Sequence, residues 1–263
     1  TVNANTSVTT YYDTVPMFTD LGGGRYALRN AYFDGNQGAL TVFDRAAAPT
    51  GVIGAANSLV NASGTTDLLT PGNSTIAALG SGHALMTPTW NSNSGAITYI
   101  PSGSTPSGII SSTTSLVGTA NQGVGGTAKL LSNGKLLIGS PGWNNNRGAA
   151  TLLANTGGLA NTLTGSITLD GSNSFIGQSS GDRVGSGGFA DLGNDIFVVY
   201  SPDFGSGASS RSIYGAVTLG DSVTNALKGE VTTGNSFFSS VAGQSAASYI
   251  SGEGRSEERR VGK

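Results

Sequence analysis

The stretch that decides the fold is Leu130–Leu153, which reads LLSNGKLLIGSPGWNNNRGAATLL. Lys135–Ile138 is a short, mostly apolar run of strand length that follows a Ser-Asn-Gly turn. Pro141 ends this strand because proline has no N–H group to donate to a ladder. After a polar loop, Gly148–Leu153 resumes as a strand. The stretch therefore predicts a strand, a tight turn, a second strand, a loop and a third strand.

The same pattern occurs four times in the chain. Each copy has an aromatic residue near the polar loop, and these residues are Phe33, Trp90, Trp143 and Phe204. Each copy also has a Gly-Ala pair that starts the following strand, with the glycines at Gly38, Gly95, Gly148 and Gly215. The pairs recur every ~53–67 residues, and such a period indicates an array of supersecondary units. We place the repeats at about 15–70, 71–123, 124–183 and 184–244, with partial repeats at both ends.

Composition favours a folded, glycine-punctuated protein with an uncharged polar surface. Glycine accounts for 42 of the 263 residues, whereas charged residues make up 11% and the formal net charge is −2. This near-neutral charge offers no electrostatic footprint for nucleic acid. The chain has no cysteine, which excludes disulfides and thiolate metal sites. No apolar run approaches the ~18 residues that a membrane helix needs.

The repeats predict an all-β fold with almost no helix. Each unit offers about four short strands with polar turns between them, which favours a β-propeller-like array of four-stranded blades. The second strand of a unit is apolar at successive positions, as in Ile196–Val199. Such a strand suits a middle position that neighbouring blades cover on both faces. A right-handed β-solenoid is the alternative architecture.

The two ends of the chain lie inside repeats. Residues 1–16 parallel the end of a repeat, and Ala246–Arg255 parallels the start of one. We therefore expect a fragment in which residues 1–255 form a single repeat domain. Residues 256–263, SEERRVGK, hold five charged residues in eight and are interpreted as a non-native tail.

The units resemble the FG-GAP repeats of integrin α-chain propellers. The resemblance lies in the Val-Gly-Ser-Gly-Gly opening at Val184–Gly188, the Ile-Gly-Ser-Pro of Ile138–Pro141 and the strand start at Gly148. The units are also similar to a repeat of uncharacterised function in large secreted bacterial proteins related to filamentous haemagglutinins and autotransporters. This resemblance implies an extracellular or outer cell-surface location, and it brings no catalytic residues.

The aromatic residue of each repeat is the candidate ligand-binding position. Phe33, Trp90, Trp143 and Phe204 could form stacking platforms for sugars, or they could wedge between adjacent blades. Integrin-type repeats often bind calcium in acidic loops, but among the matching turns here only Gly193-Asn194-Asp195 carries a carboxylate. We therefore predict no metal site and no cofactor.

No catalytic constellation stands out in the sequence. His83 is the only histidine, and no nucleophile motif accompanies it. Asp182 and Arg183 precede the fourth repeat, where a salt bridge or a loop hydrogen bond is the expected role. The predicted function is therefore a non-catalytic adhesion, ligand-binding or scaffold segment, with glycans or a host or neighbouring cell surface as partners. A carbohydrate-active hydrolase or lyase is the alternative, and it would need two carboxylates in one cleft.

Overall fold

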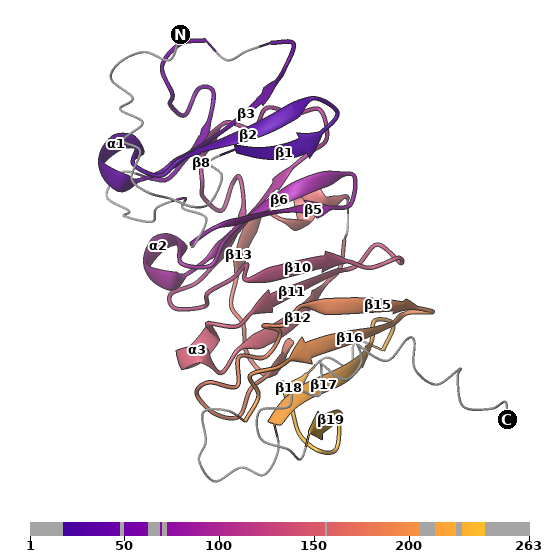
Figure 1. The fold of residues 1–263 in the computed structure, drawn as a ribbon. Helices are drawn as coiled ribbons and strands as arrows, with labels where there is room; N and C mark the ends of the chain where they lie inside the picture. The colour runs from indigo at the N-terminus through magenta and orange to yellow at the C-terminus, as the bar shows by residue number, and fades with distance from the viewer. Residues whose placement is uncertain are drawn as a thin grey trace, which may run out of the picture. The chain divides into compact units, whose positions relative to one another are not determined.

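The computed structural model shows an all-β chain with one sheet for each repeat (Figure 1). The residues it describes are 18–47, 50–62, 69, 73–155, 157–205, 214–224 and 228–239. The chain divides into two compact units, which are 1–125 with 155–168, and 126–154 with 169–263. The predicted tail at 256–263 and the predicted partial repeats at 1–16 and 246–255 lie outside the described residues.

The first unit contains two five-stranded sheets. The order of the first sheet is β1 (Phe18–Gly22), β2 (Arg25–Asn30), β3 (Ala39–Asp44), β4 (Leu59–Val60) and β8 (Gly108–Ile109). The order of the second sheet is β13 (Gly165–Ile167), β9 (Leu116–Gly118), β7 (Ala96–Ile100), β6 (Gly82–Thr87) and β5 (Thr75–Leu79). In each sheet the first three strands of the repeat form an antiparallel meander.

The second unit contains one five-stranded and one four-stranded sheet. The order of its first sheet is β10 (Thr127–Leu130), β11 (Leu136–Ser140), β12 (Ala149–Leu153), β14 (Ser174–Ile176) and β18 (Gly229–Glu230). The order of its second sheet is β15 (Phe189–Gly193), β16 (Ile196–Ser201), β17 (Tyr214–Asp221) and β19 (Ser236–Ser239).

The second, third and fourth repeats each donate one strand to the sheet of the preceding repeat, and we call these the exchanged strands. The sequence did not predict them. Strand β8 of the second repeat pairs in parallel with β4 of the first, and β13 and β18 pair in the same way with β9 and β14. We expected four-stranded sheets, each built from the strands of one repeat. In three sheets a strand of the following repeat is added beside the last strand, which itself pairs with the Gly-Ala strand. The expected four-stranded sheet therefore becomes five-stranded wherever a later repeat supplies its segment.

Helix is confined to single turns in the described part of the chain, as the sequence predicted. The four short helices are α1 (Phe33–Asn36), α2 (Trp90–Asn93), α3 (Trp143–Asn146) and α4 (Leu159–Thr162). The first three follow the middle strand of their repeats and carry an aromatic residue at their first position. This places the predicted candidate residues at the same point of three repeats.

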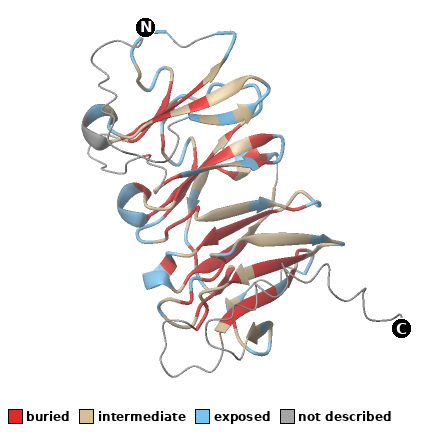
Figure 2. Ribbon diagram, in the orientation of Figure 1, coloured by how far each residue is buried: buried red, intermediate tan, exposed pale blue. Residues whose placement is uncertain are grey.

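The core of each unit is built from the middle and Gly-Ala strands, which Figure 2 shows as mostly buried. Leu136, Leu137 and Ile138 of β11 are at most 1% exposed, so the prediction of a middle strand covered on both faces is confirmed. Fully burying such a side chain stabilises the fold by about 1.5–3 kcal/mol. In the first unit, Leu59 and Ile110 share one apolar cluster, and in the second Phe175 and Val231 share another. The exchanged segments therefore contribute to the core of the sheet that receives them.

Candidate functional site

The most uniform feature of the repeats is a turn that joins the aromatic residue to the glycine of the Gly-Ala pair. In every repeat the glycine N–H group donates a hydrogen bond to the aromatic carbonyl. The four bonds are Gly38 to Phe33 (3.3 Å), Gly95 to Trp90 (2.9 Å), Gly148 to Trp143 (3.1 Å) and Gly215 to Phe204 (2.8 Å). The four copies therefore share this hydrogen bond, although more residues separate the aromatic residue from the glycine in the fourth repeat.

In the second and third repeats, the glycine of this turn also lies against the start of the next repeat. Gly148 has φ 77°, and a Cβ atom built on it would lie 2.0 Å from the Val184 nitrogen. A Cβ atom on Gly95 (φ 78°) would lie 2.2 Å from the Val124 nitrogen. Gly95 forms an isolated parallel bridge to Val124, and Gly148 forms one to Val184. Only glycine combines this backbone conformation with so close an approach.

The loops of the second and third repeats hold three successive residues in the left-handed region. In α3 these are Asn144, Asn145 and Asn146, with φ between 46° and 63°. In α2 the equivalent residues are Asn91–Asn93. Left-handed backbone costs a non-glycine residue about 1–2 kcal/mol, and asparagine tolerates it better than most. The turn directs the Asn146 carbonyl at the loop before the fourth repeat, where it accepts bonds from the Gly181 and Arg183 N–H groups.

The aromatic side chains beneath these loops are mostly interior. Trp90 and Trp143 are 7% and 8% exposed, Phe204 is fully buried, and Phe33 is half-buried. The Trp143 indole N–H donates to the Leu169 carbonyl (3.1 Å), and the Phe204 ring lies 5.2 Å from that of Phe238. Trp90 and Phe204 belong to apolar clusters that combine residues of two neighbouring repeats. This geometry favours the wedge interpretation over the stacking platform, and the ligand-binding role remains a prediction.

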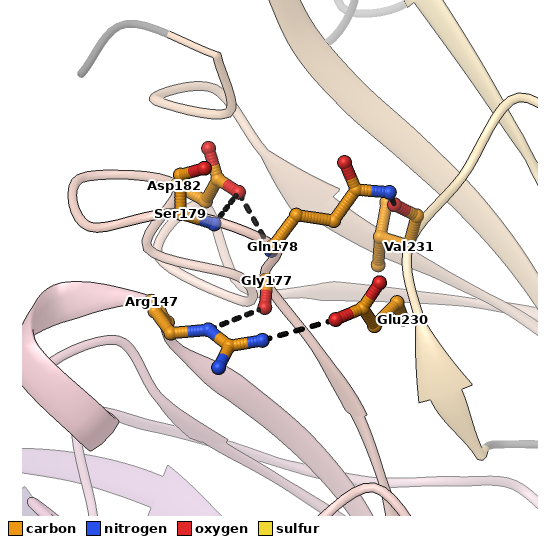
Figure 3. Close-up of polar contacts among 7 residues, drawn as sticks. All are labelled: Arg147, Gly177, Gln178, Ser179, Asp182, Glu230 and Val231. Carbon is orange, nitrogen blue, oxygen red and sulfur yellow. Dashed lines mark hydrogen bonds and ion pairs between the residues drawn. The ribbon is translucent and has the colours of Figure 1, made fainter. Parts of the chain in front are cut away.

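Asp182 organises the loop between the third and fourth repeats, as Figure 3 shows. Its buried carboxylate accepts hydrogen bonds from the N–H groups of Gln178 and Ser179, both at 2.8 Å. Its other oxygen accepts from the Gly205 N–H group at 3.0 Å. The predicted loop hydrogen bond is therefore found at Asp182. The salt bridge falls instead to Arg183, whose Nε lies 3.7 Å from an Asp203 oxygen at an exposed site.

Arg147 connects the same loop to the exchanged strand β18. Its Nε donates to the Gly177 carbonyl at 2.8 Å, and its guanidinium pairs with Glu230 at 3.2 Å (Figure 3). The guanidinium carbon also lies 5.8 Å from the Trp143 ring centre. Gln178 adds a bond from its side-chain amide to the Val231 carbonyl (2.9 Å). Side chains of the third repeat therefore hold the donated segment of the fourth.

The sheets of the third and fourth repeats meet at a second polar junction, at the end opposite to the Asp182 loop. The Asp191 carboxylate accepts from the Gly193 N–H (2.9 Å) and from the Ser132 N–H (2.5 Å). These two bonds, with a smaller contribution from Lys129, hold the pKa of the Asp191 carboxyl below its ordinary value of 3.8. Asn133 donates to Asp195 at 2.6 Å across the same junction. The Ser-Asn-Gly turn of the third repeat is therefore attached to the fourth repeat.

A hydroxyl pair in every repeat, buried in the first three and partly buried in the fourth, was missed by the sequence analysis. Each pair joins a threonine of the Gly-Ala strand to a serine beside the last strand, with oxygen atoms 2.6–2.7 Å apart. The pairs are Thr41 with Ser58, Thr98 with Ser115, Thr151 with Ser174, and Thr218 with Ser236. The signal was present, because each threonine lies three residues after the glycine of the Gly-Ala pair.

The described residues do not gather the side chains that metal binding or triad chemistry requires. Among them, no three His, Asp or Glu side chains lie close enough to hold a metal ion. His83 lies half-buried on β6, paired in register with Ala78 and Ile100. No helix within the described ranges is long and apolar enough to cross a membrane. The polar junctions around Asp182 and Asp191 join one repeat to the next.

Comparison with known proteins identifies the repeat. A family model described as a repeat of unknown function (DUF5650) matches residues 22–75, 82–126, 130–186 and 191–248. The chain belongs to this family. The prediction of four repeats of uncharacterised function is confirmed, and each matched DUF5650 stretch contains one of the four aromatic-glycine turns. A search of the curated proteins finds no match to the chain.

Proposed function

We propose that the chain is a non-catalytic scaffold segment of a secreted or surface-exposed bacterial protein, and that it holds adhesive loops outside the cell. The observation that carries the scaffold role is the exchange of strands between neighbouring repeats. A repeat whose core is completed by its neighbour resists separation from it, and this gives a repeat array its continuity. The uncharged Gly/Ser/Thr/Asn-rich composition and the resemblance to repeats of secreted bacterial proteins support the location.

The adhesive part of the proposal rests on the exposed left-handed loops. Asn144, Asn145 and Asn146 are exposed above the buried Trp143, and Asn91–Asn93 are exposed above Trp90. The asparagine amides and the Ser92 hydroxyl can donate and accept hydrogen bonds, as hydroxyl-rich ligands such as glycans require. The backbone of these loops is fixed by its own hydrogen bonds, so little ordering would accompany binding.

The β-propeller-like arrangement of the four sheets, with FG-GAP-like repeats, belongs to the same proposal. Apolar residues on both faces of the middle strands support it, since such strands need neighbours on both sides. Electron microscopy of the chain tests this arrangement. Sheets set radially about one axis would support it, and sheets stacked along one line would contradict it.

Two experiments test location and adhesion. In the source bacterium, protease added to intact cells should degrade the full-length protein, whereas a cytoplasmic protein should survive until lysis. On a glycan array, binding by the whole chain should weaken in a variant with Asn144→Gly and Asn145→Gly. Glycine accepts the left-handed backbone, so this variant keeps the fold while it removes the amides.

The non-catalytic part of the proposal has its own test. An unbiased polysaccharide-degradation screen should show no turnover by the chain. Turnover that disappears on a single Asp→Asn substitution would contradict the proposal and favour the hydrolase or lyase alternative.

A further inference from the structure

Across the described ranges, the fourth sheet has four strands, whereas each of the other three sheets receives a fifth strand. In those sheets the edges of β4, β9 and β14 pair in parallel with a segment of the next repeat. Within the described residues, β19 pairs with β17 alone. The fourth sheet therefore ends at an edge where the repeat pattern places one more strand.

The apolar residue on this edge is uncovered. Phe237 of β19 is 68% exposed, although it occupies the position of Leu59, Leu116 and Phe175. These three counterparts are at most 5% exposed. The fourth sheet thus shows the aromatic surface that a donated strand and its aliphatic residue would cover.

The first repeat holds a donor segment that is shaped for this role. Gly51 has φ 97°, close to the values of 90–111° at the donor glycines Gly108, Gly165 and Gly229. Within the described residues, no strand pairs with Gly51–Ile53, and Val52 is 71% exposed. Among the residues that the structure describes, there is therefore one donor segment without an acceptor strand and one acceptor edge without a donor segment.

The turn that follows each donor segment is also in place. Asn57 closes the turn with bonds from the Gly54 N–H to its side-chain oxygen and from its amide to the Val52 carbonyl, both at 3.0 Å. Asn235 makes the same two bonds, from the Thr232 N–H and to the Glu230 carbonyl, at 2.8 and 2.9 Å. Gly51–Ile53 is therefore held in the local geometry of a segment that is already donated. Its pairing would require little further ordering.

We propose that Gly51–Ile53 of one copy of the chain adds as a fifth, parallel strand to the edge of β19 in a second copy. By the register of the three internal pairs, Gly51 lies opposite Phe237 and Val52 opposite Phe238. The Ile53 N–H then donates to the Phe238 carbonyl, as Ile110 donates to Val60 and Val231 to Ile176 (both 2.9 Å). Because donor and acceptor are different surfaces, the contact is head-to-tail and each copy can make it twice.

The side chain of Ile53 provides the apolar part of the contact. Its counterparts Ile110 and Val231 are at most 1% exposed in their acceptor sheets, whereas Ile53 is only half-buried. Val52 has the counterparts Ile109 and Glu230, which stay exposed after pairing. Ile53 should therefore matter for association, and Val52 should not.

Sedimentation velocity of the full chain over a range of concentrations tests the proposal. The wild-type chain should associate as its concentration rises. Ile53→Ser and Phe237→Ser should each weaken association by about tenfold or more, because each removes an apolar side chain from the contact. Val52→Ser is the matched control for the donor. Leu192→Ser, on the opposite edge strand of the same sheet and 57% exposed, is the control for the acceptor.

Single-thiol variants distinguish pairing between chains from pairing within one chain. The chain has no cysteine, so Val52→Cys and Phe238→Cys each carry a single thiol. Under mild oxidation the mixture should give a mixed disulfide dimer faster than either variant alone forms its own dimer. Because Phe237 is exposed, its substitution should leave the melting temperature unchanged, which confirms that the variant is folded.

Three outcomes would overturn the proposal. They are a monomer at every concentration, association that Ile53→Ser and Phe237→Ser leave unchanged, and mixed disulfides that form no faster than the two self-pairings. Association that instead depends on Val52 or Leu192 would point to a different contact. None of these outcomes bears on the cellular location, which the protease experiment tests separately.

Discussion

The Gly-Ala glycines of the second and third repeats, Gly95 and Gly148, must satisfy two requirements. At Gly148 the backbone is left-handed, and the Val184 nitrogen occupies the space of a side chain. The first requirement comes from the turn that starts the strand, and the second from the neighbouring repeat. One residue therefore sets both the local turn and the distance between repeats.

Gly148→Ala should lower the free energy of unfolding by about 3 kcal/mol or more, because backbone strain adds to a clash with backbone atoms. Urea denaturation measures the change. Gly142→Ala is the matched control, since Gly142 has φ −79° and nothing within 4 Å of its Cβ position. An alanine at 148 that is tolerated as well as one at 142 would contradict this account.

Asp182→Asn should lower the free energy of unfolding by about 2–3 kcal/mol. An amide has one acceptor oxygen where the buried carboxylate uses two, so a backbone N–H group loses its partner. Thermal or urea unfolding checks this. Asp203→Asn removes an exposed carboxylate from the same junction and should cost less than about 1 kcal/mol. Equal losses in the two variants would show that the Asp182 bonds do not stabilise the loop.

The lowered pKa of Asp191 predicts a pH dependence. A carboxyl whose pKa is lower in the folded than in the unfolded state stabilises the fold above its unfolded pKa, and this stabilisation disappears as the pH falls through the folded pKa. Asp191→Asn should therefore be less stable than wild type at neutral pH. The two proteins should converge well below the ordinary value of 3.8. Urea midpoints at the two extremes test this, and a pH-independent difference would refute it.

At the scale of elements, each Gly-Ala strand is joined to the last strand of its repeat by a hydroxyl pair. Thr98 and Ser115 are at most 2% exposed, and their oxygens lie 2.6 Å apart. Backbone pairing between these strands covers only two positions, Ala96 with Val117 and Ile97 with Leu116. The side-chain bond therefore extends a short ladder by one more connection.

Thr98→Val should lower the free energy of unfolding by about 1–3 kcal/mol, because it removes the main partner of a buried serine hydroxyl. The double variant Thr98→Val with Ser115→Ala removes both polar groups and should recover part of the loss. Measurements on the two single variants and the double variant form a double-mutant cycle. Strictly additive effects would show that the two hydroxyls do not interact.

The middle and Gly-Ala strands could be predicted from sequence, whereas the exchanged strands could not. Leu136–Ile138 is apolar at successive positions, and Gly148 precedes the next strand, so length and turn chemistry identified both. In contrast, Gly108–Ile110 reads as a strand without indicating which sheet it joins, since a short segment can complete any complementary edge. The aromatic residues were found at the correct register. Their burial depends on tertiary packing, which the pattern leaves open.

At the scale of the whole molecule, neighbouring repeats share cores within each compact unit. Val231 of the fourth repeat is fully buried in the cluster that contains Phe175 of the third, and its N–H donates to the Ile176 carbonyl. A change in one repeat should therefore be felt in the repeat before it, as nearest-neighbour coupling in repeat proteins requires.

Val231→Ala should lower hydrogen-exchange protection in β14 of the third repeat as well as in β18. The cavity that it leaves lies between residues of both repeats, and it should cost about 0.5–2 kcal/mol. Hydrogen-exchange mass spectrometry measures protection segment by segment. Val223→Ala, at a residue 65% exposed, is the control. Loss of protection confined to the fourth repeat would mean that the donated strand does not couple the two repeats.

The exchanged strand also has a consequence for synthesis on the ribosome. The first sheet needs β8, which is separated from β4 by almost the length of one repeat. When β4 has just emerged from the ribosome, that sheet therefore cannot be completed until the following repeat has been synthesised. Translation runs from the N-terminus, so each sheet matures one repeat behind the ribosome, and a pause within a repeat leaves the previous sheet with an open edge.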